Sequence, residues 1–109
     1  MTNLEYHALL ALAQGPLHGY GIKEAIEQES GGTVLPRAGS MYRMLARLMT
    51  TGLVEEAPTP DGARPHPGLA RRYYALTPNG KRALATEVQR LKGAVRLAEK
   101  RLRTQEGRS

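Results

Sequence analysis

The chain has 109 residues, enough for one domain with a modest core, and no cysteine, which excludes disulfides, thiolate chemistry and Cys-based zinc sites. Its 16 Lys and Arg outnumber its 10 Asp and Glu, and the net charge is +6. This charge favours a polyanionic partner, nucleic acid first and an anionic membrane second. The alternative is a basic surface that only keeps the protein soluble. No stretch approaches the roughly 20 apolar residues that span a bilayer, so we expect a soluble cytoplasmic protein without membrane contact.

The first predicted helix runs from Asn3 to Gln14. Thr2 and Glu5 have the spacing of a capping box, and Gly15 with Pro16 ends the helix. Its apolar residues form one stripe (Leu4, Ala8, Ala11 and Leu12) and a second stripe on another side (Tyr6, Leu10 and Ala13). A helix that is apolar on two sides must be covered on two sides, so the second stripe needs a further element or a second subunit.

Two more helices are predicted, from Gly19 to Ser30 and from about Ala38 to Thr51. The later helix has one face with the spacing of buried residues (Met41, Met44, Leu45 and Leu48). Its opposite face is basic and has no carboxylate (Gly39, Arg43, Ala46, Arg47 and Thr50, with Tyr42 at the edge). This face is free to meet a polyanion.

A β-hairpin follows the third helix. One strand is expected at Leu53–Glu56, a Pro-, Gly- and Arg-rich loop at 57–70, and the returning strand at Arg72–Leu76. Tyr73 and Tyr74 alternate across that strand, so one should face the core and the other outward. Three helices followed by a strand, a long loop and a strand predict a mainly α fold with a small β-hairpin, a winged helix-turn-helix whose wing is the loop.

A long helix is predicted from Pro78 to about Gln105, with Thr77 at its N-cap. Its apolar seam alternates in steps of four and three (Leu84, Val88, Leu91, Val95, Ala98 and Leu102), which is the pattern of helices that bury themselves against another helix. Packing within the chain is the alternative, but three short helices cannot cover this helix along its length. We therefore expect a winged domain at 1–77, a dimerisation helix at 78–105 and a disordered tail at 106–109.

Together these segments resemble the PadR family of bacterial transcriptional regulators. The resemblance rests on the order and spacing of four pieces, GPLHGYGI at 15–22, AGSMYRMLARL at 38–48, GLVEE at 52–56 and RRYYALTPNG at 71–80. It implies operator binding by a homodimer, usually as a repressor, with relief by a small effector at the dimer interface, where Tyr6 is the one well-placed aromatic residue. Arg37, Ala38 and Gly21 depart from the usual family pattern.

The candidate DNA-binding residues lie on the third helix and in the wing. The helix and the residue just before it offer Arg37, Gly39, Ser40, Tyr42, Arg43 and Arg47. Gly39 permits close approach, and the side chains of the others can bond bases in the major groove or phosphates. The wing offers Arg64, Arg71 and Arg72, with His66 beside them. The candidate dimer interface combines the first-helix stripe and the seam (Tyr6, Leu10, Leu84, Val88, Leu91, Val95, Ala98 and Leu102).

Other kinds of site find little support in the sequence. His18 has no partner at metal-ligand spacing, so we expect it to make a structural hydrogen bond near the start of the second helix. Gly19 and Gly21 lack the context of a dinucleotide fingerprint, and no nucleophile, base and orienting group occur together, so we expect no enzyme, cofactor or metal. A protein-binding winged helix and a nonspecific nucleic-acid binder remain as alternatives. Lys23 is a weak DNA candidate, because its helix also carries glutamates.

Overall fold

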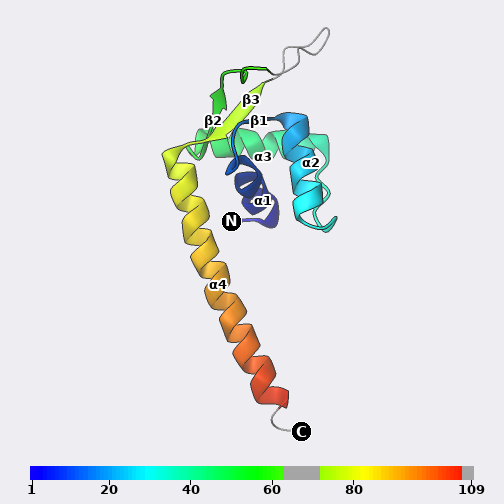
Figure 1. The fold of residues 1–109 in the computed structure, drawn as a ribbon, viewed down its shortest axis with the longest axis vertical. Helices are drawn as coiled ribbons and strands as arrows, with labels where there is room; N and C mark the ends of the chain where they lie inside the picture. Colours follow the sequence, from blue (N-terminus) through cyan, green and yellow to red (C-terminus); the bar gives the residue numbers. More distant parts are fainter. Residues whose placement is uncertain (63–71, 107–109) are drawn as a thin grey trace.

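A computed structural model describes residues 1–62 and 72–106. Its elements follow one another in the order α1 (Asn3–Leu12), β1 (Leu17–His18), α2 (Gly19–Glu29), α3 (Ala38–Thr50), β2 (Val54–Ala57), β3 (Tyr73–Leu76) and α4 (Pro78–Glu106). Figure 1 shows α1 to α3 and the sheet gathered at one end, with α4 running away from them. This mainly helical architecture with a small antiparallel sheet confirms the predicted fold class, and helix ends fall within two residues of those expected.

The core lies where α1, α2 and α3 meet the sheet. Leu9, Ile22, Ile26 and Met44 have no exposed surface. The predicted buried face of α3 is confirmed, since Met41, Met44, Leu45 and Leu48 are all at most 2% exposed. Tyr20 differs from its apolar neighbours in α2 and is 62% exposed, because two residues of helix turn it away from Ile22.

The sheet has three strands in the order β1-β3-β2, one more than the hairpin predicted from the sequence. The two-residue strand β1 pairs antiparallel with β3, placing His18 opposite Tyr73. The prediction that one of Tyr73 and Tyr74 faces outward is wrong, because both are at most 9% exposed. Tyr74 belongs to the core, and the ring of Tyr73 packs edge-on against His18 at a centroid distance of 5.4 Å. The added strand therefore pairs with the edge of β3 that a plain hairpin would leave open.

Local capping fixes the starts of the first two helices. In the predicted capping box of α1, the Thr2 N–H donates to Glu5 at 2.9 Å and the Glu5 N–H donates to Thr2 at 3.1 Å. The Thr2 N–H also lowers the pKa of Glu5. At α2, His18 Nδ1 accepts the N–H of Gly21 at 2.9 Å, which is the structural role expected for this histidine.

The exposure of α4 changes along its length. Leu84 packs against the core, and Val88 and Leu91 are half-buried beside α1. From residue 92 to residue 106, which we call the distal segment, every residue is exposed. Glu106, expected to begin a disordered tail, is the last residue of the helix, and the rest of that tail, 107–109, lies outside the described residues.

Candidate nucleic-acid interface

Three of the predicted DNA-binding residues come together at the first turn of α3. Arg43 Nη2 lies 3.5 Å from Ser40 Oγ, and Arg43 Nη1 lies 3.4 Å from the point that a Cβ on Gly39 would occupy. The guanidinium therefore extends back along the helix toward its N-terminus. It lies beside the bare backbone of Gly39, and all thirteen residues of α3 lack a carboxylate that could neutralise the charge.

The N-terminus of α3 adds hydrogen-bond donors to this cluster. Arg37 is the N-cap residue, its side chain is exposed, and it makes no capping hydrogen bond. The N–H groups of the first turn therefore lack a side-chain acceptor, and the partial positive charge of a helix N-terminus favours an anion. A cation at this position is unfavourable for the helix itself, so an incoming phosphate would relieve the repulsion.

Tyr42 lies on one flank of α3, against the start of α2. Its hydroxyl oxygen lies 2.7 Å from where a Cβ on Gly19 would be, so only glycine at position 19 allows this placement. The side chain is nevertheless 52% exposed. Burial raises the pKa of Tyr74, and the nearby Tyr42 hydroxyl adds to the effect. Gly19 was missed as a supporting residue, since no local pattern links it to a tyrosine so distant in sequence.

Arg47 lies on the opposite flank, one helical turn beyond Arg43 and toward α1. It is exposed, and its charge contributes to the lowered pKa of Glu5, after the hydrogen bonds from Thr2. The structure therefore separates the predicted residues of α3 into a central group at the first turn and two flanking side chains, Tyr42 and Arg47. Such an arrangement offers central donors to base edges and flanking donors to the two phosphate strands.

Of the wing residues predicted to contact DNA, Arg72 lies within the described residues. Arg72 precedes β3, its side chain is 73% exposed, and its Nε lies 4.0 Å from Glu56 Oε1 on β2. The other wing candidates, Arg64, His66 and Arg71, lie outside the described residues. Lys23, the weak DNA candidate, forms an ion pair with Glu27 at 2.7 Å.

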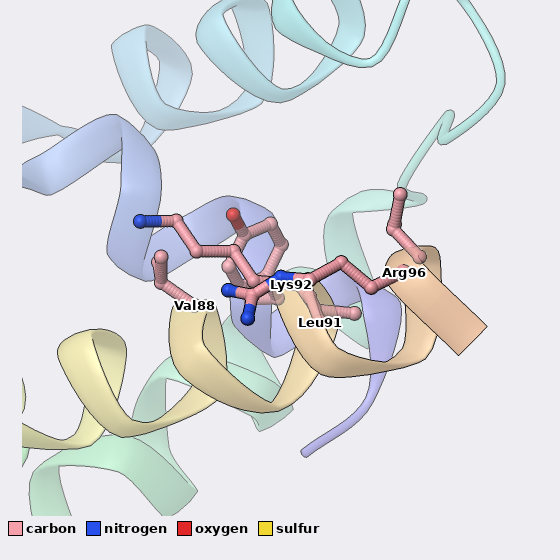
Figure 2. A pocket seen from close by; sticks show the side chains of 6 residues that line it. Val88, Leu91, Lys92 and Arg96 are labelled. Atoms are coloured by element: carbon pink, nitrogen blue, oxygen red, sulfur yellow. The ribbon is translucent and has the colours of Figure 1, made fainter. Parts of the chain in front are cut away.

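An open groove of about 480 Å³ separates α1 from α4. Figure 2 shows side chains of α4 rising toward α1 around it. It is lined by Tyr6, Val88, Leu91, Lys92, Val95 and Arg96. Tyr6 and Leu10 are half-buried, so the chain's own α4 supplies part of the cover that we expected from a second subunit. Apolar walls and two cations make the groove suited to an amphipathic anion.

The described ranges offer little for other functions. Within residues 1–62 and 72–106, no three His, Asp or Glu side chains lie close enough together to hold a metal ion. None of the helices in the same ranges combines the length and the apolar character needed to span a membrane.

Comparison with known sequences identifies one family. The sequence model of the transcriptional regulator PadR-like family matches residues 8–86. A protein from Streptomyces fradiae, described as an uncharacterized 37.1 kDa protein in transposon TN4556, is 44% identical over 90 residues. The match covers 80% of this chain but 23% of that protein, so the chain spans about a quarter of its relative's length.

Comparison with solved structures gives matches to the same fold. Bacillus subtilis PadR in complex with operator DNA is 28% identical with a TM-score of 0.65, and the match covers 80% of this chain and 47% of that one. A PadR family transcription regulator from Clostridium difficile has a TM-score of 0.75 at 21% identity, covering 93% of this chain and 99% of the other. The second likeness extends over nearly all of both chains and concerns the fold alone.

Proposed function

The chain belongs to the PadR-like family of transcriptional regulators, and we propose that it binds a pseudo-palindromic operator as a homodimer and represses transcription. The observation that carries this proposal is the exposed face of α3, which presents arginines, a serine and a glycine and no carboxylate. The PadR of Bacillus subtilis, with the same fold, was crystallised on operator DNA. We assign DNA recognition to residues 1–77 and dimerisation to 78–105.

In this proposal the first turn of α3 enters the major groove. Arg43 donates to the O6 and N7 of guanine, the commonest specific contact, while Ser40 bonds a base or a phosphate and Gly39 permits close approach. Arg37, Tyr42 and Arg47 bond phosphates on either side of the groove. The wing arginines at 64, 71 and 72 contact the backbone or the adjacent minor groove.

The exposed seam of the distal segment supports the proposal of a second copy of the chain. Val95 and Leu102 are 56% and 65% exposed, although they continue the regular seam of α4. Leu84 already packs against its own core, so the proposed interface runs from Val88 to Leu102, with Tyr6 and Leu10 at its edge. A two-fold pair of these helices would hold two copies of α3 against successive turns of one duplex.

The groove between α1 and α4 is the proposed effector site. A small molecule with an apolar body would contact Tyr6 and Val88, and its anionic group would pair with Lys92 and Arg96 (Figure 2). Because the groove shares Val88, Leu91 and Val95 with the proposed dimer interface, an occupant would change the relation between subunits and therefore the affinity for the operator. This coupling would make repression responsive to a metabolite.

The test is selection of duplexes from a random pool by the purified full-length chain. We expect an enriched inverted repeat, and Arg43→Ala should lose about 1–3 kcal/mol for one lost bidentate contact and relax the preference at that base. Arg101→Ala is the matched control, because it removes the same charge from the distal segment and should leave the selected sequence unchanged.

Two other outcomes would contradict the proposal. Equal, salt-dependent binding to every duplex would make the protein a nonspecific nucleic-acid binder. Retention by an acidic protein partner without retention on any duplex would make it a protein-binding winged helix.

A further inference from the structure

The start of α4 is tied to the turn that follows α3. The Thr77 hydroxyl donates to the carbonyl oxygen of Gly52 at 2.6 Å, and the Thr77 N–H donates to that of Leu53 at 3.1 Å. The same hydroxyl accepts the N–H of Gly80 at 3.0 Å, which caps α4. Leu53 in turn donates its N–H to Leu48 in α3 at 2.9 Å. A short chain of hydrogen bonds therefore links the last turn of α3 to the first turn of α4.

Gly80 brings these two backbones into close contact. A Cβ built on Gly80 would lie 2.0 Å from the carbonyl oxygen of Leu53, 3.0 Å from its carbonyl carbon and 3.1 Å from a methyl of Leu76. The first of these atoms belongs to the backbone and cannot move aside as a flexible side chain can. Any larger residue at position 80 must push α4 away from the turn after α3.

Gly93 on the same helix has a different environment. No atom lies within 4 Å of a Cβ built there, so this position can accept alanine without any displacement. The two glycines lie on the same helix, but the packing requires the absence of a side chain at position 80 and not at position 93. Only the one at position 80 is explained by packing.

We propose that Thr77 and Gly80 are positioning residues that set the angle between α4 and the recognition helix α3, and thereby the spacing of the two operator half-sites. The inference rests on the proposed function, because the spacing has meaning only for a dimer on DNA. The helix rises about 1.5 Å per residue, so α4 extends roughly 40 Å beyond Gly80. A small rotation at its start is therefore amplified at the distal segment, which would join the subunits (Figure 1).

A spacer series tests the proposal on DNA. The two half-sites enriched by the wild-type chain are placed at separations from three base pairs shorter to three longer, on the order of one third of a helical turn either way. We expect Gly80→Ala to change the preferred spacing or to lose the preference, while Gly93→Ala keeps the wild-type profile. Thr77→Val should act in the same direction as Gly80→Ala, and Thr77→Ser, which keeps the hydroxyl, should restore the wild-type spacing.

A distance measurement on the free protein separates this inference from the proposed function. Because the chain has no cysteine, spin labels can be attached at Thr50→Cys on α3 and Gln105→Cys on α4, with unlabelled chain in excess so that distances within one subunit dominate. We expect Gly80→Ala to shift or broaden this distance and Gly93→Ala to leave it unchanged. This result does not depend on whether the protein binds DNA.

The outcomes are distinguishable. If the wild-type chain enriches no inverted repeat, the proposed function fails. The distance between the labels then decides whether Thr77 and Gly80 set the angle between α4 and α3. If Gly80→Ala and Thr77→Val are folded and keep both the wild-type spacing and the wild-type distance, the inference is wrong. Loss of the fold in both variants also overturns it, because the contacts would then maintain the domain and not an angle.

Discussion

The winged domain and the distal segment of α4 both contain regularly spaced leucines, but these leucines are buried in the domain and exposed in the distal segment. Leu45 in α3 and Leu102 in α4 each belong to a regularly spaced apolar stripe, yet Leu45 is 1% exposed and Leu102 is 65% exposed. In α3 the neighbouring elements cover the stripe completely. In the distal segment α1 borders only the groove at Lys92, Val95 and Arg96, and every residue remains exposed. The difference indicates that the domain is stabilised by its own packing, whereas the exposed part of the seam, from Val95 to Leu102, would be buried by association.

The largest expected effect tests the domain side of this contrast. Leu45→Ala should lower the free energy of unfolding by about 2–5 kcal/mol, because it removes buried methyl groups and leaves a cavity in a packed core. Urea unfolding followed by circular dichroism at a fixed protein concentration measures the loss. Leu97→Ala is the matched control, because Leu97 lies in the distal segment off the proposed interface and is 46% exposed, so it should cost much less. Equal losses would remove the contrast between the two regions.

The next effect tests the distal side. Val95→Asp places a charge in the middle of the proposed interface, where it would be buried without a partner. The dimer dissociation constant should rise at least tenfold, which corresponds to about 1.4 kcal/mol, as measured by sedimentation equilibrium. Thr86→Asp, on an exposed face of the same helix, should leave the constant unchanged. A wild-type chain that sediments as a monomer would show that the seam has another role.

A smaller effect is expected at the contact between α2 and α3. Gly19→Ala forces the Tyr42 ring to move, since the new Cβ would lie 2.7 Å from its hydroxyl oxygen. Affinity for the selected operator should fall by about 1 kcal/mol, because the displaced hydroxyl weakens its hydrogen bond to a phosphate, with little change in base preference. The same substitution in a Tyr42→Ala background should have almost no further effect. Additive losses in the double variant would mean that Gly19 acts independently of Tyr42.

The smallest effect concerns the capping box at the start of α1. The pKa of Glu5 is lower in the folded chain than the ordinary value of about 4.3, because the Thr2 N–H donates to its carboxylate. Its contribution is therefore complete above that ordinary value and is lost as the pH falls through the folded pKa.

Glu5→Gln should accordingly be less stable than the wild type at pH 7, by about 0.5–1 kcal/mol, and the difference should shrink below about pH 4. Urea unfolding across that range measures it. Glu99→Gln, on the distal segment, serves as the control for removing a carboxylate outside a capping box. A difference that grows on acidification would contradict the assigned sign.

Local signals in the sequence were enough to predict the helices, their caps and the buried face of α3. The spacing of apolar residues, the spacing of capping residues and the glycines that end helices each involve only a few neighbouring residues. They can therefore be recognised without knowledge of the fold. Contacts between distant segments could not be predicted in this way. The pairing of Leu17–His18 with β3, the close approach of Gly80 to Leu53 and the support of Tyr42 by Gly19 all depend on how elements meet.

The sequence predicted which residues belong to the candidate site, but not how their side chains lie relative to one another. The sequence assigned Arg43 and Arg47 to one exposed face, and the structure turns Arg43 toward the first turn and Arg47 toward α1. It also assigned the Tyr6 stripe to a partner subunit, whereas α4 of the same chain already covers part of it. Both differences arise because a helical pattern gives the direction of a side chain but not its neighbours.

The contact of Tyr42 with Gly19 has a consequence for attempts to redesign the operator preference. Position 19 cannot be varied as a free choice, because the space beside it is occupied by a side chain from another helix. A combinatorial library built on α3 alone keeps the widest choice at position 42, since glycine leaves the most room there. A side chain at position 19 needs a smaller residue or a displaced ring at position 42, so those substitutions require the two codons to be randomised together.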